Sequence, residues 1–183
     1  MKQYLITDPL YYGNSVFEFK EKLSIALEKN QVDIACFRDK TSKNFKELAR
    51  TFVQTCQEYN IETILINEDY LLAKELGASG VHLTSEQFNK IQEAKDLDLF
   101  VIISCHTIFE IEKAQKKYVN AVTFSPIFLT PNKGEPKGVG KLKEVTSIFD
   151  MNIIALGGII SETELKKLKG VNLYGFASIR YFT

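Results

Sequence analysis

Of the two histidines in the sequence, His106 is the one placed for proton transfer, directly after a β-rich run that ends in Ser104 and Cys105. Because adjacent strand residues point to opposite faces, His106 shares its face with Ser104, which argues against a cysteine–histidine nucleophile pair. A histidine titrates near neutral pH and serves as general base or general acid. The alternative for His106 is a structural hydrogen bond at a helix start. His82, between two apolar residues, is predicted to be a hydrogen-bonded structural residue.

Charged residues follow two other apolar runs. Arg38 and Lys40 project to the same side of an extended chain, with Asp39 opposite, and two converging cations suit a carboxylate or a phosphate group. The alternative is a surface salt-bridge cluster that involves Asp39. After the next run, Glu68 and Asp69 offer a carboxylate pair that suits Mg²⁺. They equally suit the acidic first turn of a helix, which the helix dipole favours.

The segment FSPIFLTPNKGEPKGVG (124–140) combines an apolar run with a polar cluster. Thr130 supplies a hydroxyl, Asn132 an amide and Lys133 a positive charge. The run is expected to be a strand that extends to residue 128, followed by a loop in which glycines let the backbone approach a ligand. The alternative for each residue is a solvated turn. The glycines of this loop are Gly134, Gly138 and Gly140.

A glycine pair, Gly157 and Gly158, ends another apolar run, and Arg180 follows the last run directly after Ile179. Backbone N–H groups at such places, together with a helix N-terminus, form phosphate sites. A charge-assisted bond from Arg180 would strengthen the grip on the anion.

These residues need elements that bring them together, and eight β-rich runs alternate with amphipathic stretches. The runs cover residues 4–8, 33–40, 62–67, 80–83, 100–106, 121–128, 152–158 and 174–179. Capping-box spacing marks four helix starts, and a glycine marks one helix end. The pairs at the starts are Ser15 with Glu18, Asn44 with Glu47, Thr107 with Glu110 and Ser161 with Glu164, and the glycine is Gly77.

Strand and helix alternation implies parallel strands with right-handed crossovers. An open doubly wound sheet fits, but eight runs favour a closed (β/α)₈ TIM barrel of the α/β class over residues 1–183, a compact single domain. In such a barrel the chemistry lies where the carboxyl ends of the strands meet their loops. The chain stops four residues after Ile179, so the last helix is expected to be truncated. A neighbouring subunit of an expected homodimer, or a very short terminal turn, is predicted to cover that part of the wall.

Composition excludes several classes of protein. Lys plus Arg and Asp plus Glu both total 23, so zero net charge gives no general attraction to nucleic acid or to an anionic membrane. The apolar runs are too short to span a bilayer, and no signal peptide is evident. The three isolated cysteines, Cys36, Cys56 and Cys105, indicate buried reduced thiols. A cytoplasmic location is expected.

Taken in order, YLITD, FRDK, LINED, LGASGVHLTSEQ, ISCHT, SPIFLTPNKG, ALGGI and YGFASI resemble the thiamine phosphate synthase and thiazole tautomerase (TenI-like) superfamily over nearly the whole chain. The resemblance implies a barrel that binds a small thiazole phosphate. In the synthase, a magnesium-bound pyrimidine diphosphate loses pyrophosphate and is captured by the thiazole nitrogen. In the tautomerase, proton transfer makes a carboxythiazole phosphate aromatic, and no metal or other cofactor takes part.

The resemblance also implies roles for single residues. Those that would meet the diphosphate and the departing pyrophosphate are Arg38, Lys40, Asn67, Ser104 and Lys133. Those that would line the thiazole and hold its phosphate are Thr130, Asn132, Gly157, Gly158, Ile179 and Arg180. His106 matches the catalytic histidine of the tautomerase.

Departures from the family pattern separate the two activities. Gln87 stands where the synthase has an aspartate that binds magnesium, Glu68 replaces another metal-binding aspartate, and Cys36 replaces a glutamine. Losing an anionic ligand weakens Mg²⁺ binding. The expected function is therefore a tautomerase-like isomerase in thiamine biosynthesis with His106 as general base and acid. The alternatives are a Mg²⁺-dependent synthase with Glu68 as metal ligand, or a non-catalytic binder of thiazole or thiamine phosphate.

Overall fold

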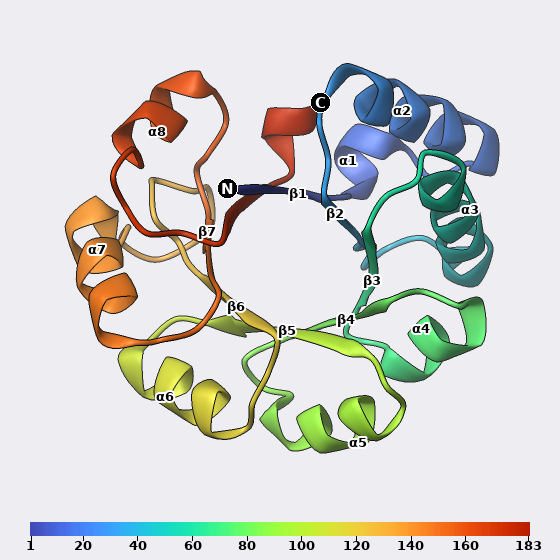
Figure 1. Ribbon diagram of the computed structural model, residues 1–183. Coiled ribbons are helices and arrows are strands. Elements are labelled where there is room, and N and C mark those ends of the chain that lie inside the picture. Colours follow the sequence, from blue (N-terminus) through green and yellow to red (C-terminus); the bar gives the residue numbers. More distant parts are fainter.

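The computed structural model describes all residues from 1 to 183 and shows eight parallel strands closed into a barrel (Figure 1). Each strand pairs with the next in sequence, and β8 pairs with β1 to close the ring. The predicted barrel is therefore confirmed. The strands are β1 (Lys2–Ile6), β2 (Ile34–Phe37), β3 (Thr63–Asn67), β4 (Gly80–Leu83), β5 (Phe100–Cys105), β6 (Ala121–Phe124), β7 (Ile153–Leu156) and β8 (Gly175–Ser178).

Helices form a ring outside the strands (Figure 1). None has the length and apolar character that a membrane crossing requires. The α-helices are α1 (Pro9–Tyr12), α2 (Val16–Lys29), α3 (Phe45–Glu58), α4 (Tyr70–Leu76), α5 (Ile91–Asp96), α6 (Ile108–Lys116), α7 (Gly138–Ile148) and α8 (Glu162–Lys167). Two 3₁₀ turns complete the ring, η1 (Phe88–Lys90) and η2 (Arg180–Phe182).

The last unit of the barrel has η2 in place of a helix, which confirms the predicted truncation. In Figure 1 this red turn lies between α8 and α2. Phe182 is buried and stacks on Phe176 of β8 with ring centroids 6.0 Å apart, and Tyr181 meets the same ring edge-on at 5.1 Å. Three aromatic side chains of the chain itself therefore pack together at this part of the wall.

Local hydrogen bonds explain where the helices begin. Complete capping boxes start α6, with Thr107 and Glu110, and α8, with Ser161 and Glu164. The other two predicted boxes are not complete. Ser15 accepts from the Glu18 N–H, but the Glu18 carboxylate turns to Lys22, and Asn44 makes no side-chain cap bond. Gly77 ends α4 in the left-handed conformation, as predicted.

Six strands are shorter than their predicted runs, and β1 lies two residues earlier than predicted; the largest shortfalls are in β6 and β2. The strand after residue 121 ends at Phe124 rather than at residue 128, because Pro126 has no N–H to donate to a ladder. Strand β2 stops at Phe37, before the Arg38–Lys40 segment. The predicted glycine loop is also too long, since α7 begins at Gly138.

Two apolar cores hold the barrel together. Alternate strand residues face inward, and nine buried side chains fill the interior, among them Tyr4, Cys36, Leu65 and Ile154. The residues between them pack outward against the helices in a larger core. All three cysteines are buried and unbridged, as predicted, with Cys36 in the interior and the other two in the outer core.

We expect glycine at position 80 to be required by the β4–β5 ladder. A Cβ on Gly80 would lie 2.0 Å from the backbone oxygen of Phe100, its ladder partner, whereas a Cβ on Gly140 of α7 would meet nothing within 4 Å. Gly80→Ala should lower the free energy of unfolding by about 3 kcal/mol, while Gly140→Ala should raise it by about 0.5 kcal/mol. Urea denaturation measures both, and equal midpoints for the two variants would contradict this account of the barrel wall.

Candidate functional site

The carboxyl ends of the eight strands meet at one rim of the barrel, where most of the predicted site residues lie. Asn67 ends β3 and Ser104 lies one residue before the end of β5, and both are half-buried. Each lies two residues beyond a buried member of the interior core, Leu65 or Ile102, and therefore points into the barrel. Two predicted polar ligands thus reach the mouth from the inside.

Arg38 lies at this rim and is already paired. Its guanidinium donates to the Asp8 carboxylate at 2.7 Å, from the loop after β1. Its backbone N–H donates to the Thr7 hydroxyl at 2.9 Å. The cation is therefore positioned by β1 rather than by Asp39, and the predicted Asp39 salt-bridge cluster is wrong. Asp39 instead accepts from the N–H groups of Thr41 and Ser42.

Lys40 and Glu68 form the second rim ion pair, at 2.9 Å. Glu68 also accepts from the Asn67 amide at 3.0 Å, and its side chain keeps 40% of its surface exposed. Asp69 does not join this group, because it caps α4 and accepts from the Leu72 N–H at 2.8 Å. Of the predicted carboxylate pair, Asp69 is thus the helix start, and only Glu68 faces the rim.

Glu68 is the single carboxylate that these observations leave for a metal ion. Gln87 is occupied: its amide donates to the Glu68 carbonyl at 3.1 Å, and its oxygen accepts from Thr84. No group of three or more histidine, cysteine, aspartate or glutamate side chains is arranged to hold a metal. Mg²⁺ commonly binds through one or two carboxylates together with substrate phosphates. The residues present therefore fit a magnesium ion that a diphosphate brings with it, with Glu68 as the protein ligand.

His106 has a defined orientation. Its Nδ1 lies 3.1 Å from the carbonyl oxygen of Ser125, and since a carbonyl only accepts, Nδ1 carries the hydrogen when the ring is neutral. Nε2 has no partner within the protein and keeps its lone pair. The His106 backbone N–H donates to Glu110, which fixes the start of α6. This arrangement leaves a base available at Nε2.

His82 is buried inside the barrel, as the structural prediction required, but its partners were not anticipated. Nδ1 lies 2.8 Å from the Tyr4 hydroxyl, and Nε2 lies 3.1 Å from the Ser104 hydroxyl. Burial lowers the pKa of His82 to about 4, helped by the Arg38 guanidinium and opposed by the Glu68 carboxylate. The imidazole is therefore neutral near pH 7.

Gly157 and Gly158 are required by the segment after β6, which lies directly against them. Their φ angles are 98° and 70°, a region that favours glycine. A Cβ on Gly157 would lie 2.8 Å from the Pro126 Cα, and one on Gly158 would lie 2.6 Å from the Leu129 oxygen. The Thr130 hydroxyl would be 3.2 Å from the Gly157 Cβ, so Thr130 and the glycine pair come together as predicted.

Unused backbone donors lie beside the glycine pair. The N–H groups of Gly157, Gly158 and Ile179 donate to no acceptor within the protein. The Ser178 hydroxyl ties β8 to the segment after Gly158 by donating to the Ile159 oxygen at 2.6 Å. Arg180 starts the adjacent turn η2. Loops after β7 and β8 therefore present donors that suit an anion.

Asn132 and Lys133 are the two predicted residues that the structure does not bring to the others. Both are exposed, and the Lys133 N–H donates to the Thr130 oxygen at 3.2 Å in a turn. The solvated-turn alternative therefore describes them in this structure, because the segment leaves the barrel rim after Thr130.

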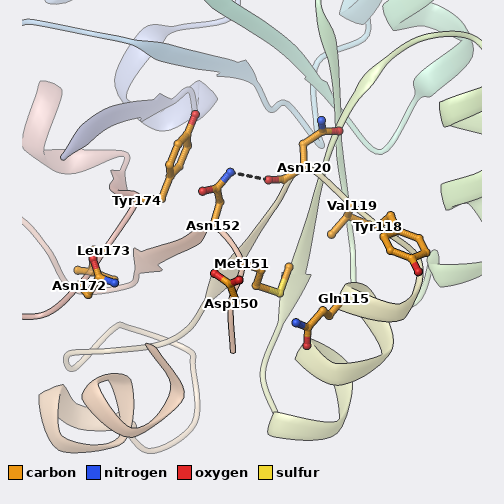
Figure 2. A pocket seen from close by; sticks show the side chains of 10 residues that line it. All are labelled: Gln115, Tyr118, Val119, Asn120, Asp150, Met151, Asn152, Asn172, Leu173 and Tyr174. Atoms are coloured by element: carbon orange, nitrogen blue, oxygen red, sulfur yellow. Dashed lines mark hydrogen bonds between the residues drawn. The ribbon is translucent and has the colours of Figure 1, made fainter. Parts of the chain in front are cut away.

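A cavity of about 740 Å³ lies at the opposite end of the barrel, among the loops that lead into β6, β7 and β8 (Figure 2). Its amides hold these loops together: Figure 2 shows the Asn152 amide donating to the Asn120 oxygen, at 2.9 Å. Neither histidine and none of the rim cations lines it. This cavity therefore lies away from the groups that can do chemistry.

Buried His82 predicts an acid-dependent stability. Its pKa is about 4 in the folded protein and about 6.5 in the unfolded chain, so the unfolded state binds the extra proton first. The free energy of unfolding should therefore fall by about 3 kcal/mol as pH drops from 6.5 to 4. His82→Gln should lose this part of the pH dependence, and His106→Asn should keep it. Urea denaturation at several pH values measures this dependence. If the free energy of unfolding fell equally with pH in wild type and His82→Gln, the pKa assigned to His82 would be contradicted.

Comparison with known proteins places the chain. A family model described as thiamine monophosphate synthase matches residues 3–182. The chain is 29% identical to a thiamine-phosphate synthase of Lactococcus lactis, over 100% of this chain and 89% of that protein. It is 31% identical to a putative thiamine-phosphate synthase 2 of Aquifex aeolicus, over 98% and 96%.

Among solved structures, the thiamine phosphate pyrophosphorylase from Pyrococcus furiosus superposes with a TM-score of 0.83 at 23% identity. The match covers 97% of this chain and 85% of that one, and it shows the shared fold. Sequence and fold therefore agree, and the chain belongs to the thiamine monophosphate synthase family of thiamine biosynthesis.

Proposed function

We propose that the protein is a Mg²⁺-dependent thiamine-phosphate synthase, a transferase that joins a pyrimidine diphosphate to a thiazole phosphate. The relatives carry the name of this activity, and they favour it over the isomerase that the departures at Gln87 and Cys36 had suggested. The observation that carries the proposal is the rim itself. Cations and hydroxyls gather on one side of it, and unpaired N–H groups gather on the other.

The two sides of the rim fit the two substrates. Arg38 and Lys40 from the segment after β2, Asn67 of β3 and Ser104 of β5 suit the diphosphate, which carries most of the negative charge. The glycine pair and Ile179 come from the loops after β7 and β8 and suit a single phosphate through backbone N–H groups. Thiazole phosphate and pyrimidine diphosphate would thus approach each other across the mouth.

In the reaction the bond between the pyrimidine methylene carbon and the diphosphate oxygen breaks, and pyrophosphate leaves with the electron pair. The lone pair of the thiazole nitrogen forms the new carbon–nitrogen bond. When bound, a magnesium ion would supply positive charge that neutralises the leaving group. The chain's own groups hold that charge through Arg38, Lys40 and Ser104, and Glu68 would hold the metal once Lys40 turns to the phosphate.

The direct test is release of pyrophosphate from the two purified substrates with and without Mg²⁺. We expect metal-dependent release together with formation of thiamine phosphate. No turnover at saturating metal would contradict the proposal.

Glu68 and Asp69 provide a matched pair of variants. Glu68→Gln removes the rim carboxylate and should raise the Mg²⁺ concentration needed for half-maximal rate by roughly tenfold, the usual cost of a lost ligand or its support. Asp69→Asn removes a charge one residue away but keeps a good helix cap. It should leave the Mg²⁺ requirement unchanged. The same metal titration for wild type and Glu68→Gln would remove Glu68 from the metal site.

His106 favours a second candidate, the thiazole tautomerase reaction. Its Nδ1 is committed to the Ser125 carbonyl, and its Nε2 is a free base at the end of β5. An aromatisation assay with a carboxythiazole phosphate tests this activity. His106→Asn should slow it by about 10²-fold or more, and equal rates would exclude His106 from a proton-transfer role.

A further inference from the structure

A chain of polar groups crosses the interior of the barrel just beneath the rim. It runs from the Tyr4 hydroxyl to His82 Nδ1 at 2.8 Å, and from His82 Nε2 to the Ser104 hydroxyl at 3.1 Å. Tyr4 and His82 are 0% and 4% exposed, whereas Ser104 is half-buried and reaches the mouth. These hydrogen bonds therefore connect a fully enclosed tyrosine on β1 with a ligand-accessible hydroxyl on β5.

The first link determines where the histidine carries its hydrogen. The Cys36 thiol donates to the Phe37 carbonyl at 3.7 Å, so its hydrogen is used there. Two acceptors are in reach of the Tyr4 hydroxyl, the Cys36 sulfur and His82 Nδ1, and the imidazole nitrogen accepts far better than a sulfur atom. Tyr4 therefore donates to Nδ1 of His82, and the single hydrogen of the neutral ring lies on Nε2.

The second link determines the direction of Ser104. Nε2–H of His82 donates to the serine oxygen, and the serine hydroxyl keeps its own hydrogen for another acceptor. Ser104 makes no other side-chain hydrogen bond in the protein. We propose that His82, fixed by Tyr4, is a positioning residue that makes Ser104 an obligatory hydrogen-bond donor toward an anionic oxygen at the rim. This inference rests on the proposed function for the identity of the anion, the departing pyrophosphate.

The surroundings keep this direction constant with pH. Burial lowers the pKa of His82 to about 4 and raises that of Cys36 to about 12, and burial also raises the pKa of Tyr4. Arg38 and Glu68, the two charged groups that act on His82, oppose each other. The donor chain therefore keeps one arrangement across the whole range from pH 5 to pH 9.

Nuclear magnetic resonance of ¹⁵N-labelled histidine tests the arrangement without any substrate. His82 should show a protonated Nε2 and an unprotonated Nδ1 that do not titrate between pH 5 and pH 9. Tyr4→Phe removes the donor to Nδ1 and should shift the Nδ1 signal. A hydrogen on Nδ1, or an imidazolium at pH 7, would overturn the proposal.

Binding of inorganic pyrophosphate in the presence of Mg²⁺ tests the consequence. Ser104→Ala should weaken binding by roughly tenfold, the cost of one hydrogen bond to a charged group. His82→Leu should weaken it similarly, and the double variant should lose no more than either single one, because His82 acts through Ser104. His82→Gln should restore binding, since its amide nitrogen reaches the position of Nε2. Thr123→Val is the control and should bind pyrophosphate as the wild type does, because the Thr123 hydroxyl lies farther from His82 Nε2 than the Ser104 hydroxyl does, at 3.5 Å.

Several outcomes separate this proposal from the proposed function. Losses that add in the double variant, or a folded His82→Gln protein that binds as poorly as His82→Leu, would overturn the positioning role. Failure of the wild-type protein to bind pyrophosphate would overturn it as well. Tight pyrophosphate binding with the expected pattern of variants, but without formation of thiamine phosphate, would support His82 and contradict the synthase assignment.

Discussion

The pairing of β8 with β1 is the constraint on which the rest of the molecule depends. Lys2 lies beside Gly175 and Leu5 beside Ser178 in this ladder, and the ladder turns an open parallel sheet into a ring. Closure gives the sheet an inside, and it carries every strand's carboxyl end to one rim. It also sets Tyr4 of β1 across from His82 of β4, so a contact between residues 78 positions apart becomes possible.

Closure also divides the interior into two chemically different sides. Most strands from β1 to β6 contribute a hydroxyl, amide or imidazole group to the interior or its rim, although β2 contributes the Cys36 thiol. In contrast, β7 and β8 contribute apolar side chains such as Leu156 and Ala177. The charged residues at the mouth lie on the polar side, where Arg38 and Lys40 are each paired with a carboxylate. Under the proposed function, a polyanion that arrives with its metal would exchange these pairs rather than face unpaired cations. Partly exposed ion pairs are weak enough to be exchanged in this way.

Sequence patterns predicted what depends on local physics. The strand GVHL (80–83) is found with its predicted bounds, and the boxes at Thr107 and Ser161 form because serine or threonine and glutamate three residues later satisfy each other. Asn44 had the same spacing and makes no cap: its backbone is not extended, with ψ of 33°, and its side-chain amide is held by donating to the Asn14 carbonyl. Sequence spacing alone does not predict a contact with a residue from another segment.

The sequence placed candidate residues at the ends of the strands, but it did not predict their contacts. Residue types at strand ends identified Arg38, Glu68, Ser104 and the glycine pair, because the barrel must gather strand ends at one rim. Which carboxylate pairs with which cation depends on loops after different strands, and no periodicity encodes that. His82 was predicted to be structural, and its link to Ser104 follows only from the three-dimensional register of β4 beside β5.

We infer that the polar side of the barrel mouth, and not the cavity at the opposite end, receives the anionic substrate. A crystal structure of the protein with pyrophosphate and Mg²⁺ tests it most directly. The account predicts pyrophosphate within hydrogen-bond distance of Ser104 and Arg38, with Glu68 on the metal. Pyrophosphate bound instead among Asn120, Asp150 and Asn172 at the opposite end, with the mouth unchanged, would contradict it.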